Sequence, residues 1–312
     1  MSKPYIQSLS LADAHKADIF SVATTDKYTI SASADGTVKL WENNDSNPAG
    51  SVLATNAVGF HHVATDTNGD ILAAVAFDGA LSLFDLRSLE PIATKINDEV
   101  SGIWAVAISG NGHMMAVTNT SGHVFQWNLE TDELVHKFPV TRPSHGICVD
   151  FSQCGEYISS GHENGGLYLF STQTGRLMYS LLGHSTPIRS VKISPNSSLL
   201  AVGDDSGIVY LYHISSGEYY TNLTGHDTWV MAVAWNESGE YVLSGSYDGK
   251  MKVWSTENKT CVCTQTALTT PVFTVAWLKK GWGLGVIGGK NQGFVAGGVG
   301  KNLVWCREAA GE

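Results

Sequence analysis

A glycine followed five residues later by an aromatic residue recurs seven times along this chain. The aromatic residues are separated by 43, 43, 43, 42, 42 and 51 positions. The pairs are Gly36 and Trp41, Gly79 and Phe84, Gly122 and Trp127, Gly165 and Phe170, Gly207 and Tyr212, Gly249 and Trp254, and Gly300 and Trp305. A repeat of this length, with an aromatic residue closing a β-type run, is typical of a β-propeller made of four-stranded blades. The spacing therefore predicts an all-β, seven-bladed propeller.

The sixth unit shows the local chemistry of one blade. Asp248-Gly249 lies between two alternating runs, which predicts a tight hairpin whose glycine adopts a positive φ. Strands are expected at residues 230–235, 241–244, 250–254 and 262–266. Because one small twisted sheet cannot bury both of its faces, seven such units around an axis supply the core that each unit lacks.

The two ends of the chain are expected to close the ring. Residues 4–9 form a short extended segment before the first repeat, and the last repeat ends at Trp305. We predict that the segment near Ile6 forms the outer strand of the seventh blade, which removes exposed sheet edges. The repeat runs without interruption from about residue 14 to residue 305, so residues 1–312 are interpreted as one propeller domain.

Composition limits the class of partner. The net charge of −10 comes from 19 basic and 29 acidic residues, and phosphate backbones repel such a chain, so we expect no direct nucleic-acid binding. The apolar runs are too short for a membrane span, and residues 1–10 contain no signal-peptide segment. Five cysteines without a CxxC pair favour neither a disulfide framework nor a zinc site, and they indicate a reducing compartment. The expected partners are proteins.

No motif in the chain predicts catalysis. His226, Asp248 and a nearby serine have the residue types of a hydrolase triad, but the sequence supplies no strained nucleophile elbow. The glycine-rich stretches at 281–285 and 297–300 lack the lysine and hydroxyl residue of a phosphate-binding loop. We therefore expect no catalytic residues, no cofactor and no metal.

Particular residues give the repeats a resemblance to the WD-repeat family. Gly183-His184 and Gly225-His226 match the dipeptide that opens each family repeat, and Ala14-His15, Trp41-Glu42 and Trp254-Ser255 are near matches to family positions. The resemblance implies a structural tetrad in two blades. Its members are His15, Ser31 or Ser33, Asp35 and Trp41 in the first blade, and His226, Ser244 or Ser246, Asp248 and Trp254 in the sixth.

The other five blades depart from this pattern. Asn56, Glu99, Arg142 and Leu268 occupy the histidine position of blades two, three, four and seven, and Ser206 replaces the aspartate of blade five. Because buried polar groups need hydrogen-bonding partners, these blades are expected to satisfy such groups differently or to bury fewer of them.

Alignment of the repeats predicts a set of residues at the top rim of the central channel. This set, called the rim residues below, comprises Phe20, His61, Trp104, Ile147, Arg189, Met231 and Phe273. A bulky apolar rim has two interpretations: it plugs the ring, or it forms an exposed patch that docks a partner. For docking, the predicted contact residues are Asp18, Ile19, Phe20, Trp104, Trp229 and Phe273. Asp18 would suit a cationic side chain of the partner.

Nearly the whole chain also resembles the family of small WD-repeat subunits of the superkiller complex, in its fungal form. The resemblance lies in residues 183–190, 223–230, 252–262 and 305–309. It implies a non-catalytic, cytoplasmic and nuclear scaffold that joins a tetratricopeptide-repeat subunit and a helicase subunit and assists exosome-mediated 3′ to 5′ decay of mRNA. It also implies a link to the meiotic double-strand-break protein. Members of this family bind short segments with a Gln-Arg pair and a nearby aromatic residue.

A second function class stays open beside this one. A propeller can serve another assembly, as a ubiquitin-ligase substrate receptor or a chromatin or transcription adaptor. Such a receptor would normally carry an additional recruiting segment, and only short tails flank the repeats. The seventh unit is about nine residues longer than the others. This insertion at 279–293 is interpreted either as a second contact with a partner or as a glycine-rich loop without a binding role.

Overall fold

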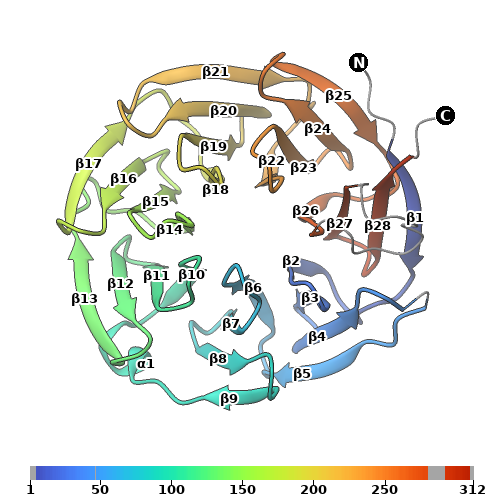
Figure 1. Ribbon diagram of the computed structural model, residues 1–312, viewed down its shortest axis with the longest axis horizontal. Helices are drawn as coiled ribbons and strands as arrows, with labels where there is room; N and C mark the ends of the chain where they lie inside the picture. Colours follow the sequence, from blue (N-terminus) through green and yellow to red (C-terminus); the bar gives the residue numbers. More distant parts are fainter. Residues whose placement is uncertain (1–4, 46, 280–291, 310–312) are drawn as a thin grey trace.

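The computed structural model describes residues 5–45, 47–279 and 292–309. They form seven four-stranded antiparallel sheets that surround a central channel (Figure 1). The prediction of an all-β, seven-bladed propeller is therefore confirmed. The short helix α1 (Ile96–Glu99) lies in the connection between the second and third blades.

Each blade contributes its strands in order from the channel outward. The innermost strands are β2 (Ile19–Thr24), β6 (Phe60–Thr65), β10 (Ile103–Ile108), β14 (Gly146–Phe151), β18 (Ile188–Ile193), β22 (Val230–Trp235) and β26 (Val272–Trp277). The second strands are β3 (Tyr28–Ser33), β7 (Ile71–Ala76), β11 (Met114–Asn119), β15 (Tyr157–His162), β19 (Leu199–Asp204), β23 (Tyr241–Ser246) and β27 (Gly293–Gly298).

The two outer layers complete the blades. The third strands are β4 (Thr37–Glu42), β8 (Leu81–Asp85), β12 (Val124–Asn128), β16 (Leu167–Ser171), β20 (Ile208–His213), β24 (Met251–Ser255) and β28 (Leu303–Glu308). The outermost are β5 (Ser51–Thr55), β9 (Glu90–Ile92), β13 (Glu133–Phe138), β17 (Arg176–Leu181), β21 (Tyr219–Thr224), β25 (Thr260–Gln265) and β1 (Tyr5–Leu11).

The seventh blade joins the two ends of the described chain. Strand β1 pairs with β28, so that Tyr5 lies opposite Glu308 and Leu11 lies opposite Leu303. This pairing places a strand from the start of the chain on the outside of the last blade (Figure 1). The predicted ring closure is therefore confirmed, and it leaves no open end in the array of blades.

Hairpin chemistry explains the join between the second and third strands. Gly249 has a φ of 78°, which a residue with a Cβ rarely adopts. The carboxylate of Asp248 accepts a hydrogen bond from the Lys250 backbone N–H at 2.8 Å. The Asp248 side chain thus stabilises the turn, and Gly249 adopts the positive φ that the turn requires.

The innermost strands share a pattern that spans all seven blades. The fourth residue of each is valine: Val22, Val63, Val106, Val149, Val191, Val233 and Val275. In four blades, the side chain at the third position accepts a hydrogen bond from the backbone N–H of the next blade's valine. Ser21 accepts from Val63 at 3.2 Å, and Thr274 accepts from Val22 at 2.9 Å. These bonds connect neighbouring blades around the channel.

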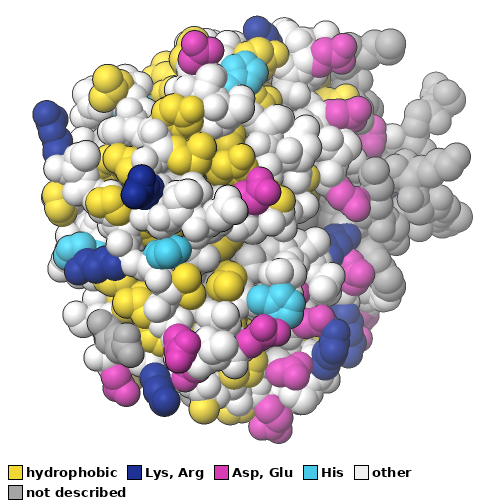
Figure 2. All heavy atoms as spheres, turned by 60° about the vertical axis from the view of Figure 1, so that its left-hand side comes forward, with side chains coloured by type: hydrophobic (Ala, Val, Ile, Leu, Met, Phe, Trp, Pro, Cys, Tyr) yellow, Lys and Arg dark blue, Asp and Glu magenta, His cyan; other side chains and the backbone are white. Residues whose placement is uncertain are grey.

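The outer surface mixes charged side chains with small hydrophobic patches (Figure 2). Among the described residues, Leu182 is the most exposed of the large hydrophobic side chains, with 85% of its surface accessible. In the part of the chain that the structure describes, no helix has the length and apolar character needed to span a membrane.

Candidate functional site at the channel mouth

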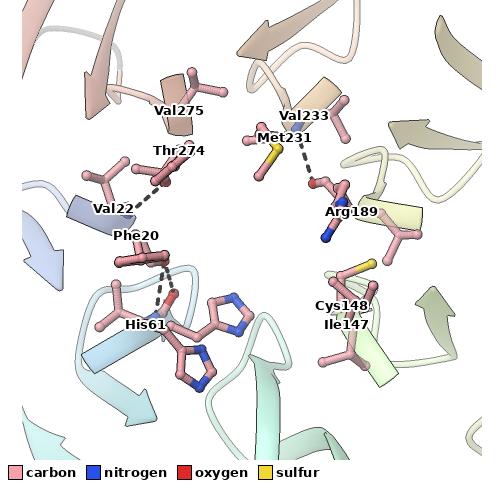
Figure 3. Close-up of a pocket in the computed structure, with 18 of the residues that line it drawn as sticks. Phe20, Val22, His61, Ile147, Cys148, Arg189, Met231, Val233, Thr274 and Val275 are labelled. Carbon is pink, nitrogen blue, oxygen red and sulfur yellow. Dashed lines mark hydrogen bonds between the residues drawn. The ribbon is translucent and has the colours of Figure 1, made fainter. Parts of the chain in front are cut away.

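All seven rim residues line one cavity at the end of the channel where the innermost strands begin (Figure 3). We call this end the top mouth. The cavity has a volume of about 290 Å³. Each rim residue is the second residue of an innermost strand, so the fold repeats the same position seven times around the axis. The alignment of the repeats thus corresponds to one continuous surface in space.

Aromatic rings form a chain around much of the top mouth. Phe20 and Phe273 have ring centroids 5.3 Å apart, and Trp104 stacks on His61 at 4.2 Å. The chain, called the aromatic arc, consists of Trp229, Tyr247, Phe273, Phe20, Phe77, His61 and Trp104, and each ring contacts the next. Offset and edge contacts of this kind stabilise ring pairs beyond the area that they bury.

Two members of the arc were missed by the sequence analysis. The ring centroids of Phe77 and Phe20 lie 5.1 Å apart, and those of Tyr247 and Trp229 lie 5.3 Å apart. Both residues stand immediately before the aspartate of a hairpin turn, outside any strand. The backbone N–H of Tyr247 donates to the Trp229 carbonyl at 2.9 Å, which brings this turn to the rim. Their position two residues before the turn glycine is a signal that the sequence contained.

The predicted contact residues do not all reach the surface. Trp229 is 40% exposed, while Phe20, Trp104 and Phe273 are half-buried at the cavity. Asp18 is also half-buried, and none of the described residues forms an ion pair with its carboxylate. Ile19 has no exposed surface and packs in the core between blades, so its assignment as a contact residue was wrong. The pairing of β2 with β3 is irregular between Ile19 and Ser21, and Phe20, the residue between them, lines the channel cavity.

Arg189 supplies the charged part of the rim. Its Nε and Nη2 donate to the two carboxylate oxygens of Asp205, each at 2.7 Å. The guanidinium also lies over the Trp229 ring, 5.2 Å from its centroid. The hydrogen bond that Arg189 donates to Asp205 raises the pKa of Arg189 more than burial lowers it. The bidentate pair therefore fixes a cation whose charge is balanced beside an exposed aromatic ring.

His61 is a neutral member of the arc. Burial lowers its pKa to about 4, although a hydrogen bond to the Ala76 carbonyl opposes the shift. Nε2 of His61 is covered and has no hydrogen-bond partner among the described residues. The ring thus acts at neutral pH as a stacking surface for Trp104.

The tetrad residues of the first blade form one hydrogen-bonded chain. His15 Nδ1 lies 3.0 Å from Asp35, its Nε2 lies 2.7 Å from Ser31, and Trp41 donates its indole N–H to Ser31 at 2.8 Å. Burial would raise the pKa of Asp35, but hydrogen bonds from Thr37, the Lys16 backbone and His15 lower it to about 2. Burial lowers the pKa of His15. The stable arrangement is a neutral histidine that donates to a charged aspartate.

The sixth blade repeats this chain with the same geometry. His226 lies 2.9 Å from Asp248 and 2.8 Å from Ser244, which also accepts the Trp254 indole N–H at 2.8 Å. Ser244 and not Ser246 is therefore the hydroxyl of this blade, as Ser31 is in the first. Ser244 has no exposed surface, so a substrate has no access to the hydroxyl. The arrangement ties a hairpin to the loop before the blade.

The fifth blade keeps the histidine–aspartate contact by a different residue. His184 Nδ1 lies 2.9 Å from Asp204, and Tyr212 reaches its Nε2 at 2.8 Å. Ser206, expected in place of the aspartate, instead donates a hydrogen bond to Asp204. This carboxylate comes from the last residue of β19, two positions before Ser206, where the other tetrads have their aspartate. This blade departs in sequence but retains a charged partner for its histidine.

The remaining blades lack the tetrad, and the contacts that take its place differ from blade to blade. Asn56 donates to Asp78 at 3.4 Å in the second blade, and Trp127 donates to Asp132 at 3.1 Å in the third. Leu268 is buried among hydrophobic residues in the seventh. The predicted insertion at 279–293 falls mostly outside the described residues, although Lys279 donates to the Thr67 carbonyl.

The family model for the WD domain, G-beta repeat, matches residues 6–42, 175–213 and 217–255. These segments contain His15, His184 and His226, the three histidines that contact an aspartate. The meiotic recombination protein rec14 of Schizosaccharomyces pombe is 33% identical over 204 residues, which cover 64% of this chain and 67% of that protein. This chain belongs to the WD-repeat family.

Two further WD-repeat relatives align over similar lengths. The antiviral protein SKI8 of Saccharomyces cerevisiae is 27% identical over 251 residues, which cover 65% of this chain and 63% of SKI8. The WD repeat-containing protein VIP3 of Arabidopsis thaliana is 25% identical over 208 residues, which cover 60% of this chain and 63% of VIP3. The chain thus spans about two thirds of the length of these curated relatives.

Proposed function

We propose that this WD-repeat chain is a non-catalytic scaffold that docks a short segment of a partner protein across its top mouth. The observation that carries the proposal is the aromatic arc, a continuous set of rings most of which are partly exposed, beside the Asp18 carboxylate, which forms no ion pair with the described residues. Aromatic side chains at the centre of a contact commonly supply most of its binding energy. The expected partner segment carries a cationic residue and an aromatic residue.

The proposed assembly is a superkiller complex. In it, the chain would bind a tetratricopeptide-repeat scaffold and a helicase and assist exosome-mediated mRNA decay in the cytoplasm. A nuclear role with the meiotic double-strand-break protein is proposed as well. Support comes from the similarity to SKI8 and to the meiotic recombination protein rec14. One docking surface with exchangeable partners would serve both roles.

The second candidate function is that of an adaptor in another assembly, such as a ubiquitin-ligase receptor or a chromatin or transcription complex. The similarity to the COMPASS component SWD3 of Saccharomyces cerevisiae supports this class, because that relative is by name a component of a different assembly and is 25% identical over 57% of this chain. Both candidates use a docking face, so the identity of the bound proteins distinguishes them.

The test is affinity purification of the tagged full-length protein from its native cells, followed by mass spectrometry. We expect a tetratricopeptide-repeat protein and a helicase with the wild type, and their loss with Trp104→Ala. Val135→Ala, at an exposed position of the outer strand β13, is the matched control. Recovery of ubiquitin-ligase or chromatin subunits instead would support the second candidate. Unchanged recovery of partners by Trp104→Ala would reject the top mouth as the docking surface.

A further inference from the structure

The cavity inside the top mouth has walls whose polar side chains are already engaged. The third residues of four innermost strands face this region, and each accepts a hydrogen bond from the next blade. The acceptors are Ser21, His62, Ser190 and Thr274, with N···O or N···N distances of 2.9 to 3.2 Å. These bonds tie neighbouring blades together and fix the orientation of the four side chains, none of which carries a charge that would select a charged ligand.

Charge in the cavity is balanced as well. Two cationic residues, Arg189 and Lys192, line it, and no carboxylate does so among the described residues. Arg189 is paired with Asp205, and Lys192 lies 2.8 Å from Asp150. A cationic ligand would therefore meet cations without a free carboxylate, while an anionic one would compete with carboxylates that already hold both cations. The charges favour an uncharged occupant.

The remaining wall is apolar. Phe20, Phe273, Ile147 and Met231 stand at the rim, and six of the seven fourth-position valines line the space below them (Figure 3). Nε2 of His61 has no partner but is covered, so it does not present a polar atom to the cavity. An engineered apolar cavity of roughly 150 Å³ binds benzene. At about 290 Å³, this cavity has room for one large side chain.

We propose that the axial cavity receives one uncharged apolar side chain of the docked segment, of phenylalanine or leucine size, inserted along the channel axis. The inference rests on the proposed function, because the segment must lie across the top mouth to place a side chain there. The aromatic arc then holds the rest of the segment at the rim. Docking thus has an axial contact in addition to the rim contacts.

The first test uses small probes that need no partner protein. Benzyl alcohol, benzylammonium and benzoate share one ring and differ in charge, and saturation-transfer NMR with the full-length protein compares their binding. We expect transfer to benzyl alcohol alone, with a shift of the ¹³C-labelled Met231 methyl signal in the wild type and loss of the saturation transfer in Met231→Trp. Preferential binding of benzoate would overturn the proposal in favour of an anion site, and binding of none would also overturn it.

The second test measures affinity for the partner recovered in the purification. Met231→Trp places a large ring in the cavity and is expected to weaken binding at least tenfold without lowering Tm. Val135→Trp on β13 is the control for an added tryptophan. If Trp229→Ala weakens binding but Met231→Trp does not, the docking function stands and axial insertion is wrong. If neither weakens binding, both proposals fail.

Discussion

Tryptophans at the two mouths of the channel have different environments. At the bottom mouth, where the innermost strands end, the indole N–H of Trp235 donates to the Lys192 carbonyl at 2.8 Å, and that of Trp277 donates to the Ala234 carbonyl at 3.1 Å. Each bond crosses to the preceding blade. At the top mouth, the indoles of Trp104 and Trp229 make no hydrogen bond within the described residues. Ring contacts, packing and the Arg189 guanidinium over Trp229 hold them instead.

The difference separates structural from docking aromatics of the same residue type. At the bottom mouth, the hydrogen bond of each indole N–H joins two blades, so it stabilises the folded state. The top rings leave their N–H groups and part of their faces available, so more of their contact energy is available for binding. Substitutions at the bottom mouth should therefore lower the stability of the fold, and substitutions at the top mouth should lower the affinity for the partner.

Loss of a bottom tryptophan should have the largest effect. Trp277 is 8% exposed and packs against Tyr5 and Phe294 in the last blade. We expect Trp277→Ala to lower the free energy of unfolding by about 3 to 5 kcal/mol, as large aromatic truncations in cores do. Denaturant unfolding measures this change. Trp277→Phe, which removes the hydrogen bond but retains a ring, should cost less; equal losses would mean that the interblade bond dominates.

Truncation of top rings should weaken binding instead. Trp104→Ala and Phe273→Ala are each expected to reduce partner affinity by about 2 kcal/mol, a factor of roughly thirty, because they remove central aromatic anchors. Isothermal titration calorimetry gives the affinity, and a thermal melt of the same sample gives the stability. A variant that loses about 3 to 5 kcal/mol of stability and still binds normally would show that the rim is a plug.

Loss of a tetrad residue should lower stability, as loss of a bottom tryptophan does, although the tetrads lie near the top loops. His226→Ala and Asp248→Ala are each expected to lower the free energy of unfolding by about 1 to 3 kcal/mol, because each leaves a buried hydrogen-bonding partner unsatisfied. The control is Asp227→Ala, whose carboxylate is 72% exposed. Chemical denaturation compares the three variants. Affinity for the partner, measured in parallel, should stay unchanged.

The fold could be predicted because a single local pattern recurs. The seven glycine–aromatic pairs specify a hairpin and the strand after it, and repetition specifies the ring. Closure by residues near Ile6 followed because an array of seven blades lacked one outer strand. These inferences needed no contact between distant side chains.

The site could be predicted only in part. The rim residues follow from strand position, but Ile19 was misplaced because its burial depends on which side of β2 faces the core. Phe77 and Tyr247 come from turns, and only the folded hairpin brings them to the rim. Asp204 replaces the missing turn carboxylate of the fifth blade because a residue two positions away still reaches His184. Such substitutions are visible in space and not in an alignment of repeats.

The smallest expected effect comes from the rim charge. Asp18 is half-buried, and its carboxylate is free of ion pairs with the described residues. Asp18→Lys should weaken binding of a cationic segment modestly, by about 1 kcal/mol or less for an exposed pair, and mainly by slowing association. Asp18→Asn is the control that removes the charge without reversing it.

Association rates measured by surface plasmon resonance at low and high salt test this expectation. Because salt screens exposed charges, the gap between wild type and Asp18→Lys should narrow as ionic strength rises, while the effect of Trp104→Ala should persist. A salt-independent loss for Asp18→Lys, equal to that of Asp18→Asn, would mean that the aspartate contributes through packing. The top mouth would then recognise its partner by apolar contacts alone, and the requirement for a cationic residue in the segment would be wrong.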